Sequence, residues 1–170
     1  NLISLTGHVS EDDDTLTPAE SRAPSLRTRS TDVEHLSHSH HPTSKIGILL
    51  VDDHAMVRQG LRSVLEHYDD VAVVGEASTG REAIEFVERL RPAVIVMDIN
   101  MPETNGIDAT VEIKARHPDV AVIGLSVHNT AEARKAMLQA GATTLLSKES
   151  AVDELYAAIR QALADEGVPR

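Results

Sequence analysis

Short apolar runs alternate with segments of helical period over most of this 170-residue chain. The runs are rich in β-branched residues, and their starts recur about every 25 residues, the length of one strand plus one crossover helix. Runs that are apolar on consecutive positions are typical of strands covered on both faces. The predicted strands are Ile46 to Val51, Val71 to Val74, Val94 to Met97, Val120 to Leu125 and Thr143 to Leu146.

The intervening segments carry apolar residues at helical spacing, so each predicts a helix with one buried face. Capping pairs indicate where some of these helices begin, and Gly141 suits a left-handed residue after the fourth helix. The predicted capping pairs are Thr79 with Glu82, Asn129 with Glu132, and Ser150 with Asp153. Five strands that alternate with five helices predict a doubly wound α/β fold, with a parallel sheet and helices on both faces.

The first 44 residues follow no such pattern. They are rich in Ser, Thr, Asp, His and Pro, and such a segment buries too little apolar surface to offset the entropy of ordering. We predict a disordered polar linker over residues 1–44, a folded domain over residues 45–165 and a tail over residues 166–170. A metal site is one interpretation of the linker's histidine tract, but such tracts are more often plain linker. The tract consists of His35, His38, His40 and His41.

Composition narrows the functional classes. The net charge of −11 opposes binding to phosphate backbones, and only three aromatic residues are present for stacking on bases, so we expect no direct binding of nucleic acid. The absence of cysteine leaves no disulfide or thiolate metal site, which fits a cytoplasmic location. No apolar run approaches the length of a membrane helix, so we expect no membrane contact.

Polar and charged side chains follow four of the predicted strands. Because parallel strands point the same way, groups at their carboxyl ends converge on one edge of the sheet, where such sheets bind ligands. Any one of these residues has a plainer explanation, since an acid after a strand is often a turn former or a helix cap. All of them together favour a functional site. The residues are Asp52 and Asp53, Asp98, Ser126, and Lys148.

Three neighbouring carboxylates would repel each other, by roughly 4 kcal/mol for each pair at about 4 Å and an effective dielectric constant of about 20. A cation must offset that repulsion. An all-oxygen site with open positions suits Mg²⁺, which keeps several waters and favours phosphate oxygens as partners. The Lys148 ammonium and the Ser126 hydroxyl could then balance a phosphoryl group on one of the acids.

Four stretches of the sequence resemble the receiver domain of two-component response regulators, the CheY-like family. They are "ILLVDDHAMVRQGL", "VIVMDINMPETNG", "GLSVH" and "AGATTLLSKES", and the resemblance extends from about residue 45 to residue 164. It implies a flavodoxin-like (βα)5 fold with strand order 2-1-3-4-5. It also implies a histidine kinase or phosphotransfer domain as partner, and it allows a homodimer.

The resemblance also implies a role for each candidate residue. Asp98 would accept the phosphoryl group, and Asp52 and Asp53 would hold Mg²⁺ together with Asp98 and the backbone carbonyl of Asn100. Lys148 and Ser126 would contact the phosphoryl oxygens. The chain itself would then be a phosphoacceptor domain rather than an enzyme with turnover, and phosphorylation would switch the face formed by the fourth helix, fifth strand and fifth helix.

Two positions depart from the family pattern. The usual aromatic residue three places before the lysine is Leu145 here, so an aromatic rotamer switch cannot operate. The residue after the lysine is Glu149 instead of the usual proline, and a cis bond there would cost about 3 kcal/mol. Both concern the output route more than phosphoryl acceptance. We also hypothesise that Asn100 and His128 flank the path of an attacking water and set the lifetime of the phosphate.

The origin of the chain has more than one interpretation. The first residue is Asn and no signal-peptide pattern follows, so we expect a piece of a longer protein. The long polar leader and the end at Arg170 favour the C-terminal receiver of a hybrid sensor histidine kinase. The alternatives are a free-standing receiver and a receiver trimmed from a helix-turn-helix transcriptional regulator, the branch that "DDHAMVRQGL" and "GEASTGREA" resemble most.

Two other functional classes fit less well. A phosphatase of the haloacid dehalogenase type also uses a strand-end aspartate with Mg²⁺, but it needs a second acid two residues later, where this chain has Asn100. A flavodoxin-like cofactor binder would need a Gly-rich or Thr-rich phosphate loop after the first strand, where this chain has two acids.

Overall fold

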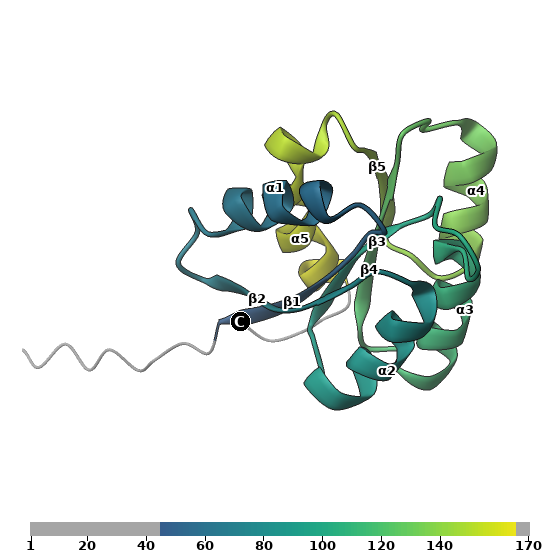
Figure 1. Cartoon of the computed structure of the whole chain (residues 1–170), viewed down its shortest axis with the longest axis horizontal. Helices are drawn as coiled ribbons and strands as arrows, with labels where there is room; N and C mark the ends of the chain where they lie inside the picture. The colour runs from purple at the N-terminus through teal and green to yellow at the C-terminus, as the bar shows by residue number, and fades with distance from the viewer. Residues whose placement is uncertain (1–44, 166–170) are drawn as a thin grey trace, which may run out of the picture. The chain divides into compact units, whose positions relative to one another are not determined.

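The computed structural model describes residues 45–165, and these form an α/β domain (Figure 1). The predicted linker, its histidine tract and the predicted tail lie outside the described residues. Strands and helices alternate without exception along the described part of the chain. They are β1 (Ile46–Val51), α1 (Ala55–Leu65), β2 (Val71–Ala77), α2 (Gly80–Leu90), β3 (Val94–Asp98), α3 (Gly106–Arg116), β4 (Ala121–Ser126), α4 (Ala131–Gln139), β5 (Thr144–Ser147) and α5 (Ala151–Asp165).

All neighbouring strands pair in parallel, and their order is β2-β1-β3-β4-β5. This confirms the predicted flavodoxin-like fold. No helix in residues 45–165 is long and apolar enough to cross a membrane.

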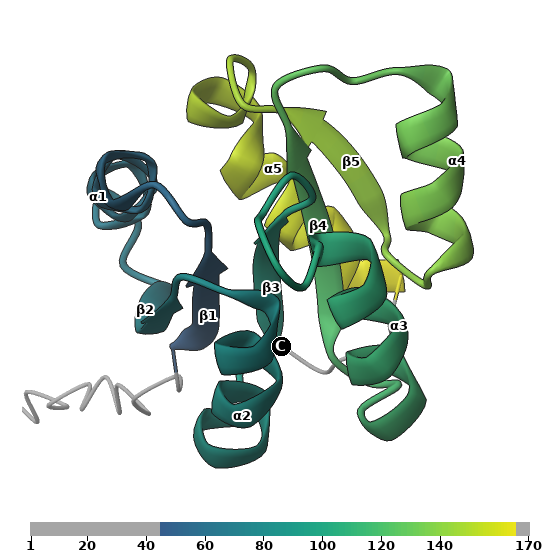
Figure 2. The same cartoon turned by 45° about the vertical axis from the view of Figure 1, so that its right-hand side comes forward.

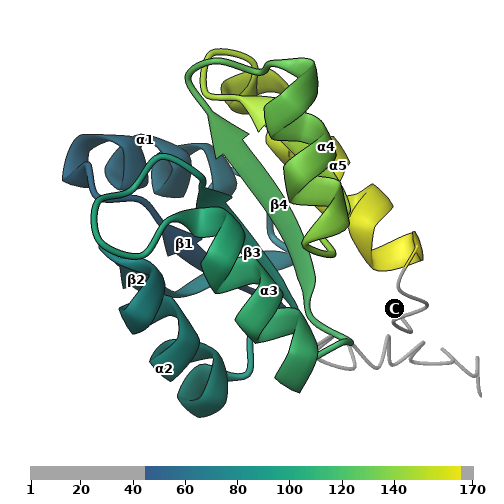
Figure 3. The same cartoon turned by 90° about the vertical axis from the view of Figure 1, so that its right-hand side faces the viewer.

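The helices cover both faces of the sheet. α1 and α5 lie on one face, and α2, α3 and α4 lie on the other, where Figure 3 shows them in front of the strands. The two faces of β1 show why its run is apolar throughout. Ile48 and Leu50 pack in the cluster under α1 and α5, whereas Leu49 and Val51 pack in the cluster under α2, α3 and α4.

The helix starts agree only in part with the predicted capping pairs. The Thr79 hydroxyl accepts a hydrogen bond from the backbone N–H of Glu82, as predicted. The prediction of Asn129 as a cap is wrong, because α4 begins one residue later and its cap is Thr130. Ser150 accepts from the N–H of Asp153 through its backbone carbonyl, and its hydroxyl pairs with Ser147 instead.

Candidate functional site

The predicted site residues stand at or just after the carboxyl ends of β1, β3, β4 and β5. These strand ends lie toward the top of the view in Figure 2. Asp52 follows β1, and Asp98 is the last residue of β3; both are buried. Asp53 is partly exposed beside them. One ligand atom from each of these acids and from His54 can be chosen so that all four atoms lie within 4.8 Å of one another. The convergence of the three acids is therefore as the sequence predicts.

Lys148 follows β5 and lies between two of these acids. Its Nζ donates hydrogen bonds to Oδ2 of Asp52 at 2.6 Å and to Oδ2 of Asp98 at 2.9 Å. Burial by itself lowers the pKa of Lys148, but the two hydrogen-bonded carboxylates outweigh it, and the pKa lies above the ordinary value. Lys148 is therefore a charged counter-ion to the buried acids.

Backbone N–H groups bind the other oxygens of the two buried acids. His54 N donates to Oδ1 of Asp52 at 2.8 Å, and Asn100 N donates to Oδ1 of Asp98 at 3.0 Å. Oδ1 of Asp53 differs, because it is buried and accepts no hydrogen bond from the described residues, although His54 Nδ1 lies 2.9 Å away. A buried carboxylate oxygen that accepts no hydrogen bond is a ready ligand for a cation.

The donor set fits the Mg²⁺ ion that the sequence predicts. Three carboxylates converge, Oδ1 of Asp53 is buried and accepts no hydrogen bond, and the single ammonium of Lys148 cannot neutralise three negative charges. Hard oxygen ligands of this kind are those that Mg²⁺ prefers. His54 adds an imidazole nitrogen at the edge of the cluster, but its side chain is 66% exposed.

Ser126 is buried at the end of β4, one residue after the Leu125 that pairs with Asp98. Its hydroxyl lies 2.9 Å from the backbone carbonyl of His128 and 3.3 Å from Oδ1 of Asn100, and it accepts from the N–H of His128 at 3.1 Å. A hydroxyl has one proton, so the carbonyl and the amide oxygen are alternative acceptors. The structure thus groups Ser126 with Asn100 and His128, and gives it no hydrogen bond to Asp98.

The loop between β3 and α3 depends on a glycine. A Cβ atom at Gly106 would lie 2.0 Å from the backbone oxygen of Asp98 and 2.9 Å from Cα of Ile99. Only a residue without a side chain can approach the strand end that closely. Gly106 therefore allows α3 to begin directly against the peptide that carries Asp98.

His54 is the site residue that sequence reasoning missed. The signal was its position, because it directly follows the two acids and precedes α1, and a side chain there lies at the same sheet edge. Its Nδ1 is 3.3 Å from Asp52 and 2.9 Å from Asp53. In the structure His54 is the N-cap residue of α1, and its side chain makes no capping hydrogen bond.

The strands of a parallel sheet run in this order, acids stand at the carboxyl ends of β1 and β3, and a lysine follows β5. Together these features define a flavodoxin-like domain with an acidic strand-end site. The family model of the response regulator receiver domain matches residues 48–160. The chain belongs to this family, as the resemblance implied.

Two curated relatives show the extent of the similarity. The transcriptional regulatory protein DegU of Brevibacillus brevis is 39% identical over 117 residues, which are 69% of this chain and 50% of the relative. The response regulator UvrY of Escherichia coli (strain K12) is 42% identical over 115 residues, 68% of this chain and 53% of the relative. The chain therefore spans about half the length of these relatives.

The fold also matches solved receiver structures. The crystal structure of the response regulator domain of Thermotoga maritima CheB has a TM-score of 0.66 and 34% identity, and the match covers 71% of this chain and 97% of that domain. Almost the whole of an isolated receiver domain is thus reproduced in the described part of this chain.

Proposed function

We propose that this domain accepts a phosphoryl group on Asp98 from the phosphohistidine of a histidine kinase or phosphotransfer domain. The observation that carries the proposal is the buried Asp98 carboxylate, hydrogen-bonded to Lys148 and clustered with two further acids at the sheet edge. Membership of the receiver family supports the same assignment.

The transfer itself needs positioning and neutralisation of charge rather than an acid or base. One Asp98 carboxylate oxygen forms a bond to phosphorus while the P–N bond of the donor breaks, and the imidazole leaves with the electron pair. The product is an aspartyl phosphate. Asn100 N and Lys148 orient the carboxylate beforehand, because each donates to one of its oxygens.

Neutralisation of the incoming charge is shared among several groups. Lys148 can follow the negative charge from Oδ2 of Asp98 to a phosphoryl oxygen, since its ammonium is a compact donor on a flexible stem. Asp52 and Asp53 would hold Mg²⁺ with Asp98 and the Asn100 carbonyl. The ion would supply charge stabilisation at the phosphoryl oxygens.

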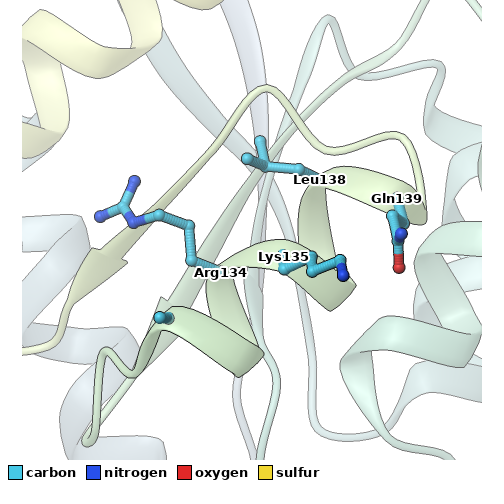
Figure 4. Close-up of a pocket in the computed structure, with 5 residues that line it drawn as sticks. Arg134, Lys135, Leu138 and Gln139 are labelled. Atoms are coloured by element: carbon cyan, nitrogen blue, oxygen red, sulfur yellow. The ribbon is translucent and has the colours of Figure 1, made fainter.

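A route to output begins at Ser126. If its hydroxyl rotates toward a phosphoryl group, it gives up its contact with the backbone of His128, in the loop that leads to α4. Arg134 of α4 donates to the backbone carbonyl of Leu145 in β5 at 2.9 Å, and in Figure 4 its side chain points away from Lys135 and Gln139. The Asn129 side chain in the loop donates to the same Leu145 carbonyl, so the loop and α4 are both bonded to the backbone of β5.

Leu145 occupies the place of the usual aromatic residue and is fully buried. A Cβ atom at Gly124 would meet Cδ1 of Leu145 at 2.7 Å and Cγ of Met137 at 2.9 Å, so these two side chains fill the space above the glycine. Switching here would act through Arg134 and the strand backbone rather than through an aromatic ring.

The comparisons favour a response regulator as the parent protein over a hybrid kinase. DegU and UvrY are named as a transcriptional regulator and a response regulator, and this chain matches about half of each. We therefore propose the alternative origin, a receiver from a helix-turn-helix transcriptional regulator. Binding of DNA would belong to such a protein's output domain, while this receiver, with its acidic sheet edge, would take the signal.

The test is phosphorylation by a small donor. The full chain is incubated with Mg²⁺ and acetyl phosphate or phosphoramidate, and its intact mass is measured with time. We expect the mass of one added phosphoryl group in the wild type, and none in Asp98→Ala or with EDTA present. Addition that persists in Asp98→Ala would refute the assignment, and sustained hydrolysis of phosphate esters would favour a phosphatase.

A further inference from the structure

Arg58 of α1 contacts the backbone beside the acidic site. Its Nη1 donates to the backbone carbonyl of Asp52 at 2.6 Å, and its Nε donates to Oε2 of Glu76 at 3.0 Å. The Arg58 side chain is only 16% exposed. Arg62, one turn further along α1, binds the other carboxylate oxygen of Glu76 but makes no described contact with Asp52. Both arginines therefore bind Glu76, but only Arg58 also binds the backbone of Asp52.

The Asp52 carbonyl needs this donor because the sheet offers none. Asp52 N–H still follows the β1–β2 ladder and donates to the carbonyl of Ala77 at 3.1 Å. In a continuing parallel pair the next donor would come from Thr79, but Thr79 is the cap of α2, so the chain has already left the sheet. Asp52 is only 1% exposed, so water cannot easily replace the missing donor.

We infer that Arg58 is a positioning residue for the acidic site, which deepens the function proposed above and rests on it. Its guanidinium stands in for the missing strand partner and fixes the peptide of Asp52. The Asp52 carboxylate is thereby held with Oδ2 toward Lys148 and Oδ1 on the N–H of His54. A metal ligand held by a second hydrogen-bonded residue keeps its orientation, and loss of that residue weakens metal binding.

The forked shape of the side chain matters as well as its charge. Arg58 binds a carbonyl and a carboxylate at once through two different nitrogens, and a lysine ammonium is a single point donor. Arg58→Lys should therefore keep the ion pair with Glu76 but not the orientation of Asp52.

The experiment compares Mg²⁺ affinity by calorimetry in the full chain for Arg58→Ala and its matched control Arg62→Ala. Both variants remove one arginine from Glu76, and only Arg58→Ala frees the Asp52 carbonyl. We expect the Mg²⁺ dissociation constant to rise about tenfold or more in Arg58→Ala, the usual effect of losing such a partner, and to stay near the wild-type value in Arg62→Ala. Equal dissociation constants in the two variants would overturn the inference.

Further variants separate this inference from the proposed function. Mg²⁺ binding by the wild type that is lost in Asp53→Asn would establish the acidic site itself. A wild type that binds no Mg²⁺ would count against the proposed function, whatever the arginine variants do. If circular dichroism shows that Arg58→Ala does not fold, Arg58→Lys decides the question. A raised dissociation constant in that folded variant supports the positioning role, and a wild-type value overturns it.

Discussion

Gly106→Ala should destabilise the domain although it replaces a glycine with the best helix former. Gly106 is the first residue of α3, where alanine gains at most about 1 kcal/mol in helix propensity. The added methyl group, however, would lie 2.0 Å from the backbone oxygen of Asp98 and 2.8 Å from its carbonyl carbon. Both are backbone atoms of a buried strand end, so neither can move aside as a flexible side chain would.

The expected loss of unfolding free energy is the difference between the steric cost and the gain in helix propensity. Overpacking of a closely packed interior costs about 1 to 3 kcal/mol, and a contact with rigid backbone belongs at the upper end of that range. After the propensity gain is subtracted, we expect Gly106→Ala to lose about 2 kcal/mol of unfolding free energy. The added methyl group would also displace the peptide of Asp98, so phosphorylation by acetyl phosphate should slow as well.

Urea unfolding followed by far-ultraviolet circular dichroism measures this loss. Gly60→Ala is the matched control, because Gly60 lies inside α1 and a Cβ atom there has nothing within 4 Å. That variant should gain roughly 0.5 to 1 kcal/mol. A Gly106→Ala protein as stable as the wild type, alongside a stabilised Gly60→Ala, would refute the reasoning from the close backbone contact.

Two further predictions concern charge. Lys148→Ala should lower the melting temperature in EDTA, because Asp52 and Asp98 lose the ammonium between them. Addition of Mg²⁺ should then raise the melting temperature more in Lys148→Ala than in the wild type. An equal rise in melting temperature in the variant and the wild type would contradict this. The pKa of Glu82 lies below its ordinary value, chiefly because the backbone N–H of Ser78 and then its hydroxyl donate to the carboxylate. A lowered pKa gives stability that is complete above the unfolded pKa and is lost as the pH falls through the folded pKa. Urea midpoints of wild type and Glu82→Gln from pH 6 to about 3 should therefore converge on acidification, and a constant gap would argue against it.

The strands were predictable because burial on both faces leaves a continuous apolar run. β2 shows the limit of that signal, because it continues to Ala77, beyond the predicted end at Val74. Gly75 and Glu76 interrupt the run, yet both pair with β1 after a shift in register. β2 is an edge strand, where polar residues remain in contact with solvent, so its pattern is weaker.

The convergence of the acids was also predictable, since it follows from the common direction of parallel strands. The contacts within the site were not. Loop geometry and side-chain rotamers decide these contacts, and the hydrophobic periodicity of a sequence contains neither. The periodicity could therefore not predict that Lys148 lies between two acids or that Ser126 bonds to the backbone of His128. The prediction of the α4 cap was wrong for a similar reason. Asn129 and Thr130 are both good caps, and the Asn129 side chain contacts the Leu145 carbonyl instead.

The packing of Leu145 and Met137 against Gly124 would limit the speed of the proposed switch. Because Leu145 and Met137 are fully buried against that glycine, α4 cannot shift along β5 without repacking both side chains and breaking the bond between Arg134 and the strand. An exposed side chain changes rotamer within about nanoseconds, whereas a collective shift of packed elements takes about microseconds to milliseconds. If phosphorylation of Asp98 switches α4 as proposed, this repacking would delay the switch, and fluctuations at the acidic site shorter than the repacking time would not reach the exposed face of α4.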